Sequence, residues 1–391
     1  MWVERIVRDE VIKAVASRPA VLLTGVRQSG KSSLLQRQFP DAKYISFDFL
    51  RYVEQAKDSP EYFLENLSGQ TVLDEIQYVP ELFRELKIFI DRNRENYGKW
   101  ILTGSQVFEL FTKISETLAG RIALIHLETL SASELRASGI SGLEDYLWKG
   151  GYPEIWRNKL LDSRIFFDSY IRTYIERDLR SIIEINNLNS FQKLFRVLAT
   201  RAGQLINYRN ISKDIGVSDV TLKTWIGALQ ASGLIYLLPP YHANIGKRLT
   251  KTPKLYFADH GLLCHLLDIY SLNDWQSHTL KGSLWENFVF TELIKTTRFT
   301  PGRNLFFYRD QNGTEMDFVA EDKKILYLIE AKAAERVEKR KLAFDKIAPL
   351  FAERYNVENI LAINIKEDNI IALKKYRYLN PLFTGFDIGN K

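Results

Sequence analysis

Short apolar runs alternate with amphipathic segments over the first 130 residues of the chain. Runs of this kind, spaced by helical patterns, are typical of a buried parallel sheet whose strands are connected by helices. Region 1–130 is therefore predicted to be an α/β domain. The expected strands are AVLLTG (20–25), KYISFD (43–48), TVLDE (71–75), WILTGS (100–105) and IALIHLE (122–128).

The pattern changes three times in the rest of the chain. Residues 131–190 are mainly helical, with a turn-like KGGYPEIW stretch and a strong helix candidate at FFDSYIRTYIERDL. Residues 191–255 contain helical spacings interrupted at Gly216 and then the apolar run LIYLLPPY. This order outlines a helix-turn-helix followed by a strand, as in winged-helix domains. Residues 256–391 return to mixed α/β, so four parts are predicted.

Composition narrows the class of protein only a little. Hydrophobic residues make up 46% of the chain and charged residues 26%, which is typical of a globular protein. Cys264 is the single cysteine, so no intramolecular disulfide forms and a reducing compartment fits. No apolar run approaches the ~18 residues of a membrane span, and the charged N-terminus does not resemble a signal peptide. We therefore expect a cytoplasmic protein with no membrane contact.

Residues 25–32 read GVRQSGKS and match G-x-x-x-x-G-K-[ST]. The motif follows a predicted strand and precedes the helical SSLLQRQF, which is the context that phosphate binding by a P-loop requires. Lys31 is expected to reach the β- and γ-phosphates of ATP or ADP, and the Ser32 hydroxyl is expected to bind Mg²⁺. The predicted nucleotide contacts are Gly25, Val26, Arg27, Gln28, Ser29, Gly30, Lys31, Ser32 and Ser33.

Two acids and two hydroxyls at neighbouring strand ends extend this site. Asp74 is expected to hold the Mg²⁺, and Glu75 to polarise the attacking water. On the run WILTGSQ, either Thr103 or Ser105 can lie between these acids and the γ-phosphate; Ser105 is the preferred candidate, with a strand cap as the alternative. Arg121 ends the run SETLAGR and is a candidate for stabilising transition-state charge, although most arginines are solvated or paired.

A second group of charged residues lies late in the chain. Asp317 falls in EMDFVA, and Glu330 and Lys332 fall in KILYLIEAK, two predicted strands. Two carboxylates and a lysine form the outline of a metal-dependent nuclease site, in which the acids hold Mg²⁺. The spacing alone is expected by chance about once per chain. Glu286 is a candidate third acid, but Ser283 to Glu286 also reads as a helix capping box. Metal binding and a structural role both stay open.

A basic surface is predicted beside the helix-turn-helix. The formal net charge of +6 mildly favours a polyanionic partner, although a basic solvated surface is the commoner cause. The segment HANIGKRLTKTPK (242–254) contains basic residues and no acid, so as a wing it would contact phosphates. A role in protein contact is equally open. The expected surface residues are Asp219, Thr221, Lys223 and Thr224 on the helix, and Lys247, Arg248, Lys251 and Lys254 on the wing.

Taken in order, these motifs resemble a large group of prokaryotic predicted AAA-type (AAA+ superfamily) ATPases that have a C-terminal domain of unknown function. The resemblance covers nearly the whole chain. It implies an AAA-like P-loop ATPase domain (1–130), a helical lid or linker (131–190), a winged-helix-like region (191–255) and a restriction-endonuclease-like domain (256–391). The matching segments are GVRQSGKSSLL, VLDEIQ, ILTGSQ, LAGRIALIHLETLSASEL, GGYPEI, YIERDL, TPKLYFADHGLL, KGSLWENFVFTEL, FYRDQNGTEMDFV and LIEAK.

The resemblance also carries over roles for single residues. It assigns the Walker lysine and serine to Lys31 and Ser32, the Walker acids to Asp74 and Glu75, and a sensor-like serine to Ser105. Arg121 matches the LAGR arginine of the group.

The expected function is an Mg²⁺-dependent ATPase that couples nucleotide state to binding of nucleic acid, DNA rather than RNA. Nuclease activity is a further prospect, and a homo-oligomer is expected. The alternative is a nucleotide-switched protein-interaction module with an inactive nuclease-like domain.

Overall fold

The computed structural model describes residues 2–104, 117–175, 188–242, 252–333, 342–364, 376–386 and 388. The chain divides into two compact units. The N-terminal unit comprises Glu4–Thr129 and Ala231–Gly233. The C-terminal unit comprises Met1–Val3, Leu130–Gln230 and Leu234–Lys391. Apart from Ala231–Gly233, the three parts predicted after residue 130 therefore fall into one unit.

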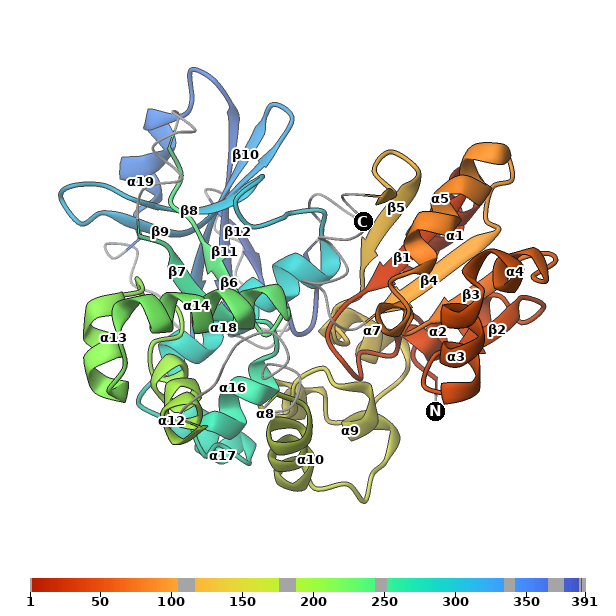
Figure 1. Cartoon of the computed structure of the whole chain (residues 1–391). Coiled ribbons are helices and arrows are strands. Elements are labelled where there is room, and N and C mark those ends of the chain that lie inside the picture. The colour runs from red at the N-terminus through yellow and green to blue at the C-terminus, as the bar shows by residue number, and fades with distance from the viewer. Residues whose placement is uncertain are drawn as a thin grey trace. The chain divides into compact units, whose positions relative to one another are not determined.

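The N-terminal unit contains a five-stranded sheet in the order β2-β3-β4-β1-β5 (Figure 1). All its strand pairs are parallel, which confirms the predicted parallel sheet. Its strands are β1 (Ala20–Thr24), β2 (Lys43–Ser46), β3 (Thr71–Asp74), β4 (Trp100–Gly104) and β5 (Ile122–His126), and its helices are α1 (Arg8–Ser17), α2 (Lys31–Gln38), α3 (Leu50–Asp58), α4 (Pro60–Glu65) and α5 (Leu82–Arg92).

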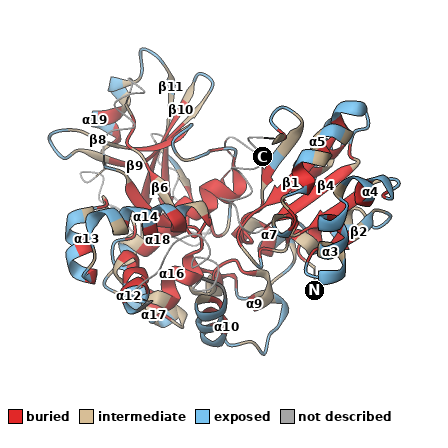
Figure 2. Ribbon diagram, in the orientation of Figure 1, coloured by how far each residue is buried: buried red, intermediate tan, exposed pale blue. Residues whose placement is uncertain are grey.

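Burial explains why these strands read as continuous apolar runs. Every residue of β1, β3 and β4 is buried, and Figure 2 shows these strands in red. A strand that is covered on both faces needs apolar side chains at successive positions, not only at alternate ones. Helix α5 has the complementary amphipathic pattern, with Leu82, Leu86 and Ile90 buried at helical spacing. The core thus fixes the ends of the strands, where the candidate nucleotide residues lie.

The C-terminal unit begins with helices. Asn207 accepts a hydrogen bond from the backbone N–H of Asn210 and caps α13, and Gly216 ends that helix with φ 73°, as the sequence predicts. A hairpin of antiparallel strands follows α14. The helices are α7 (Ala132–Ala137), α8 (Tyr146–Lys149), α9 (Pro153–Arg157), α10 (Ser163–Tyr170), α12 (Leu188–Ala199), α13 (Tyr208–Ile215) and α14 (Asp219–Ala231), and the hairpin strands are β6 (Ile235–Leu238) and β7 (Lys254–Phe257).

The rest of the C-terminal unit is built on a mixed sheet in the order β12-β11-β10-β9-β8. Strands β8, β9 and β10 pair antiparallel, and β10, β11 and β12 pair parallel. The long helix α18 is buried along most of its length. The elements are α16 (His260–Leu266), α17 (Leu272–Ser277), α18 (Lys281–Thr296), β8 (Leu305–Arg309), β9 (Glu315–Asp322), β10 (Ile325–Lys332), α19 (Phe344–Ile347), β11 (Asn356–Ile363) and β12 (Arg377–Leu379).

A buried polar network joins the start of this unit to α18. The Glu292 carboxylate accepts hydrogen bonds from the Ala132 N–H at 3.1 Å and from the Tyr146 hydroxyl at 2.8 Å. Burial raises the pKa of Glu292 to about 7. Asp259 accepts from the Gly151 N–H at 2.9 Å. Residues from the predicted lid segment therefore share buried hydrogen bonds with the C-terminal helices. No described helix is long and apolar enough to cross a membrane.

Candidate functional site

The P-loop connects β1 to α2 and is shaped by its backbone. Gly25 has φ 146°, Gln28 has φ 62° and Gly30 has φ 96°, conformations that favour glycine. Steric contact also requires glycine at position 25, because a Cβ atom there would lie 2.2 Å from the carbonyl oxygen of Leu127. A larger residue at this position would therefore require the Leu127 backbone to shift.

Lys31 is buried inside this loop, with 5% of the residue exposed. Its Nζ donates to the carbonyl oxygens of Gly25 at 3.1 Å and Val26 at 3.0 Å. Burial lowers the pKa of Lys31 to about 8, although the negative charges of Glu75 and Asp74 partly oppose this. No carboxylate of the described residues forms an ion pair with it. The loop thus contains a buried cation whose hydrogen bonds go to carbonyl oxygens and not to a carboxylate of the described residues.

Asp74 ends β3 beside this lysine and is contacted by three hydroxyls. The Ser32 hydroxyl donates to Asp74 Oδ1 at 3.0 Å, and the hydroxyls of Tyr44 and Thr103 also donate to this carboxylate. A serine hydroxyl in contact with a carboxylate presents the hard oxygen ligands that Mg²⁺ takes in proteins. The residues present therefore fit a magnesium ion between Ser32 and Asp74.

Glu75 has a left-handed backbone with φ 57°. Its N–H donates to Thr103 Oγ1 at 3.3 Å, and the Gln77 amide donates to its carboxylate. Thr103, the second choice of the sequence prediction, thus contacts both acids. Ser105, the first choice, lies outside the described residues.

Two residues of this site were not found from the sequence. Arg5 donates to the carbonyl oxygens of Ser29 at 2.8 Å and Glu128 at 2.6 Å, and it is buried. It therefore supports the P-loop from outside the motif, and no local pattern marks it. Tyr44 lies on β2, next to β3 in the sheet. The order of the parallel strands could have indicated Tyr44, because it makes β2 the neighbour of the strand that ends at Asp74.

Arg121 lies at the other edge of the sheet. It directly precedes β5, which pairs in parallel with β1 from Ala20↔Ile122 to Thr24↔His126. The P-loop follows the carboxyl end of β1, so a strand length of roughly 16 Å separates the two edges. Arg121 instead forms a bidentate ion pair with Asp91. Its Nε donates to Oδ1 at 2.8 Å and its Nη2 donates to Oδ2 at 2.7 Å. Whether Arg121 stabilises transition-state charge, in its own chain's site or in trans, stays a prediction.

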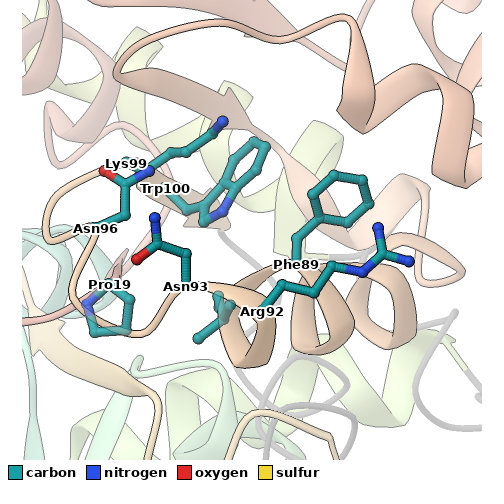
Figure 3. A pocket seen from close by; sticks show the side chains of 8 residues that line it. Pro19, Phe89, Arg92, Asn93, Asn96, Lys99 and Trp100 are labelled. Atoms are coloured by element: carbon teal, nitrogen blue, oxygen red, sulfur yellow. The ribbon is translucent and has the colours of Figure 1, made fainter.

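A cavity of about 210 Å³ opens at this same amino edge of the sheet (Figure 3). Pro19 precedes β1 and Trp100 begins β4, so the cavity is not the nucleotide site. Phe89, Ile90, Arg92, Asn93, Asn96 and Lys99 complete its lining.

The C-terminal unit brings the late acids together, and we call this group the carboxylate centre. It consists of Glu286, Glu315, Asp317 and Glu330 with Lys254 and Lys332. Lys332 Nζ lies 2.5 Å from Glu330 Oε1 and 3.9 Å from Asp317 Oδ2. Asp317 Oδ2 also accepts the backbone N–H of Ala331 at 2.8 Å. The predicted group of Glu286, Asp317, Glu330 and Lys332 is thus assembled.

Lys254 is not where the sequence predicts it. It begins the buried strand β7, and 3% of its side chain is exposed. Its Nζ lies 2.9 Å from Glu286 Oε1 and 2.5 Å from Glu315 Oε1. Burial alone lowers the pKa of Lys254, but Glu286, Asp317 and Glu315 together raise it above its ordinary value. Lys254 is therefore not part of an exposed basic wing. Lys247, Arg248 and Lys251 lie outside the described residues.

Glu286 is a member of the centre and not a capping residue. Helix α18 begins at Lys281 after Leu280, without a side-chain cap, so the capping-box alternative is wrong. The Tyr256 hydroxyl donates to Glu286 at 2.6 Å. Burial, and then Asp317, raises the pKa of Glu286, and the same two causes raise that of Glu330. Among the described residues, no cluster of three or more His, Cys, Asp or Glu has the geometry to hold a metal ion.

Helix α14 presents part of the surface that was predicted to meet nucleic acid. Leu222, Trp225 and Ile226 are buried, and Val220 is 75% exposed. Lys223 Nζ lies 5.7 Å from the centre of the Tyr208 ring. Asp219 accepts a hydrogen bond from the Ser212 hydroxyl.

Comparison with known proteins identifies the N-terminal region. Residues 17–136 match a family model described as an AAA domain. Residues 140–273 and 281–378 match two domains of unknown function, DUF8612 and DUF4143. The uncharacterized proteins Rv2008c of Mycobacterium tuberculosis and Mb2031c of Mycobacterium bovis are each 32% identical over 312 residues, which is 79% of this chain and 69% of theirs. The chain belongs to the same family as these two proteins.

The AAA domain therefore contains the P-loop, Asp74 and Glu75 described above, and the prediction of an AAA-type ATPase domain with a parallel sheet is confirmed. The winged-helix and restriction-endonuclease-like assignments stay predictions.

Among solved structures, the Walker-type ATPase PABY2304 of Pyrococcus abyssi is 16% identical with TM-score 0.45, over 67% of this chain and 94% of that one. The Thermotoga maritima RuvB Holliday junction branch migration motor is 15% identical with TM-score 0.31, over 61% and 90%. At these scores neither likeness bears on function.

Proposed function

We propose that this protein is an Mg²⁺-dependent ATPase. The observation that carries the proposal is the buried Lys31 ammonium, which lies in a P-loop beside the Ser32–Asp74 pair. Within the described part of the chain its hydrogen-bond partners are carbonyl oxygens. A buried cation without an ion-pair partner is costly. The triphosphate of ATP would supply the missing negative charge.

The residues of the site have separable roles in this proposal. Backbone N–H groups of residues 25–32 bind the phosphates, and Lys31 exchanges its carbonyl partners for phosphate oxygens. Ser32 and Asp74 hold Mg²⁺, which neutralises charge on the β- and γ-phosphates when it is bound. Glu75, positioned through Thr103 and Gln77, orients the attacking water and accepts its proton.

Two substitutions test this assignment. Lys31→Ala should abolish ATP turnover because it removes the only lysine of the loop. Glu75→Gln should slow hydrolysis while nucleotide binding stays intact, since the amide keeps the shape of the side chain but cannot accept a proton. Turnover at the wild-type rate in Lys31→Ala would show that the P-loop is not the hydrolytic site.

We further propose that nucleotide state controls binding of nucleic acid, DNA in preference to RNA, through the surface of α14. Lys223, Thr221 and Thr224 support this, because they lie outside the buried face of α14 and near its N-terminal end. Recognition helices contact a groove with residues at this position. Loss of Lys254 from the wing weakens the case, because one of its four expected cations is buried. The exposed apolar side chain of Val220 favours the alternative, a nucleotide-switched module that contacts protein.

Gel shift at about 50 mM salt, on single- and double-stranded DNA and RNA, separates these two functions. Lys223→Ala should weaken binding, whereas Lys159→Ala removes an equal charge from an exposed loop and should not. Nucleic acid should also stimulate ATP hydrolysis. If the wild-type protein binds none of these nucleic acids and is not stimulated, protein contact is the function of α14.

The carboxylate centre supports a third part of the proposal, metal-dependent cleavage of nucleic acid. Asp317 and Glu330 supply carboxylate oxygens, and Lys332, which lies beside both, would orient the water. Nicking of plasmid with Mg²⁺ or Mn²⁺ should disappear in Asp317→Ala and in Lys332→Ala. Nicking that survives both substitutions would come from a contaminant.

A further inference from the structure

The carboxylate centre contains two lysines that come from different parts of the C-terminal unit. Lys332 lies on β10, the strand that also carries Glu330, whereas Lys254 begins β7 in the hairpin that follows α14. Strand β7 is held from both sides. It pairs with β6, and Leu205 forms a β-bridge with Lys254 on the other side. The backbone of Lys254 is therefore held by β6 and Leu205, whereas the acids lie on α18, β9 and β10.

The two lysines divide the centre into two halves. In the first half, Glu286 and Glu315 lie 2.9 and 2.5 Å from Lys254 Nζ, and the Tyr256 hydroxyl also donates to Glu286. Lys254 lies further from Asp317, at 3.8 Å. Only 3% of the Lys254 side chain is exposed, against 16% for Glu286 and 30% for Glu315. The two partly buried acids of this half are therefore already paired with a buried cation.

The second half is less complete. Glu330 Oε1 is paired with Lys332, but Glu330 Oε2 is buried and has no hydrogen-bond partner within the described part of the chain. The residue is 5% exposed. A buried carboxylate oxygen without a partner costs free energy, so it indicates a missing ligand. Asp317 is the neighbouring acid, and Lys332 contacts both.

We infer that Lys254 is the built-in counter-ion of the carboxylate centre and limits it to a single divalent cation, held by Asp317 and Glu330. This inference rests on the proposed metal-dependent role of the centre. The ammonium between Glu286 and Glu315 supplies the positive charge that a second cation would bring. A second hard cation at those oxygens would have to displace Lys254 from its partners and lie against its charge.

Titration of the nucleotide-free full chain with Mn²⁺, followed by electron paramagnetic resonance, tests the inference. An Asp74→Asn background removes the P-loop carboxylate from the count. In this background we expect one bound Mn²⁺, and we expect two after Lys254→Met, which frees Glu286 and Glu315. Lys254→Arg keeps the charge and should bind one. An equal stoichiometry in the background protein and in Lys254→Met overturns the inference.

A second pair of substitutions covers the case in which Lys254→Met does not fold. Glu286→Gln with Glu315→Gln leaves Asp317 as the one acid near Lys254 among the residues that the structure describes, so the ammonium competes for that carboxylate. The affinity for Mn²⁺ should then fall tenfold or more, and an unchanged affinity overturns the inference.

The experiment also separates this inference from the proposed metal-dependent role. Binding of no Mn²⁺ by the background protein, with binding after Lys254→Met, would refute the metal-dependent role and support Lys254 as the counter-ion.

Discussion

The P-loop and the carboxylate centre each bring a buried lysine close to acids, but only one of the two lysines is paired with them. Lys31 donates to two carbonyl oxygens, and burial lowers its pKa to about 8. Lys254 contacts Glu286 and Glu315, and the nearby acids raise its pKa. In the N-terminal unit a buried lysine, Lys31, is thus available to bind an anion. In the C-terminal unit a buried lysine, Lys254, is already neutralised by acids of the chain.

The largest expected effect is on the neutralised lysine. Lys254→Met should lower the free energy of unfolding by roughly 3–5 kcal/mol, because it removes a buried ammonium and leaves the partly buried Glu286 and Glu315 without their cation. Chemical denaturation of the full chain measures this change. Lys254→Arg, which keeps the charge, should cost far less, and equal costs for the two variants would contradict the pairing.

The next effect concerns the shape of the P-loop, which backbone geometry fixes. Gly25→Ala should cost roughly 2–4 kcal/mol, because its Cβ would meet the Leu127 carbonyl oxygen in addition to the unfavourable φ. Gly69→Ala is the matched control, with φ 71° and open space around the position. It should cost only the backbone penalty of roughly 1 kcal/mol. Thermal unfolding of both variants measures these losses of stability. Equal losses would contradict the close contact between position 25 and the Leu127 carbonyl oxygen.

Sequence and structure agree best in the AAA domain because its signals are local. The runs AVLLTG and TVLDE are apolar through their length since β1 and β3 are covered on both faces. Once these strands are recognised, their ends give the positions of the P-loop, which follows β1, and of Asp74 and Glu75 at the end of β3. Arg5, by contrast, reaches the carbonyl oxygens of Ser29 and Glu128 from far away in the sequence. The spacing of hydrophobic residues along the sequence does not predict a contact between such distant positions.

Lys254 shows why the carboxylate centre was predicted only in part. The run KRLTKTPK looks like a solvated basic segment, yet its last lysine begins a buried strand. What makes that burial tolerable is Glu286 on a later helix and Glu315 on a later strand. Compensation by acids remote in the chain is a tertiary property. Asp317 and Glu330 were found because adjacent strands carry them.

A smaller effect of opposite sign is expected at Lys31. Below about pH 8 the folded, nucleotide-free protein bears the cost of a buried charge that the unfolded chain does not bear. Lys31→Met removes this cost but also two hydrogen bonds, so it should stabilise the protein by roughly 1–2 kcal/mol at pH 7. The advantage should shrink as pH rises from about 8 to about 10.5, because wild-type Lys31 then loses its proton on folding. Destabilisation at pH 7 would contradict an uncompensated lysine.

The smallest effect is expected at the amino edge of the sheet. The Arg121–Asp91 pair lies at the surface, so Arg121→Ala should change the free energy of unfolding by less than about 1 kcal/mol. Arg94 also pairs with Asp91, and Arg94→Ala is the matched control. ATP turnover should be the same in both variants. A selective loss of turnover in Arg121→Ala would instead support the predicted role of Arg121 in stabilising transition-state charge.

The difference between the two lysines is tested most directly by calorimetric titration of ATP with Mg²⁺ at pH 7 into wild type, Lys31→Met and Lys254→Met. The account predicts equal affinity for wild type and Lys254→Met, and a loss of about 100-fold or more in Lys31→Met, equivalent to roughly 3 kcal/mol. Binding of equal strength by wild type and Lys31→Met would contradict it.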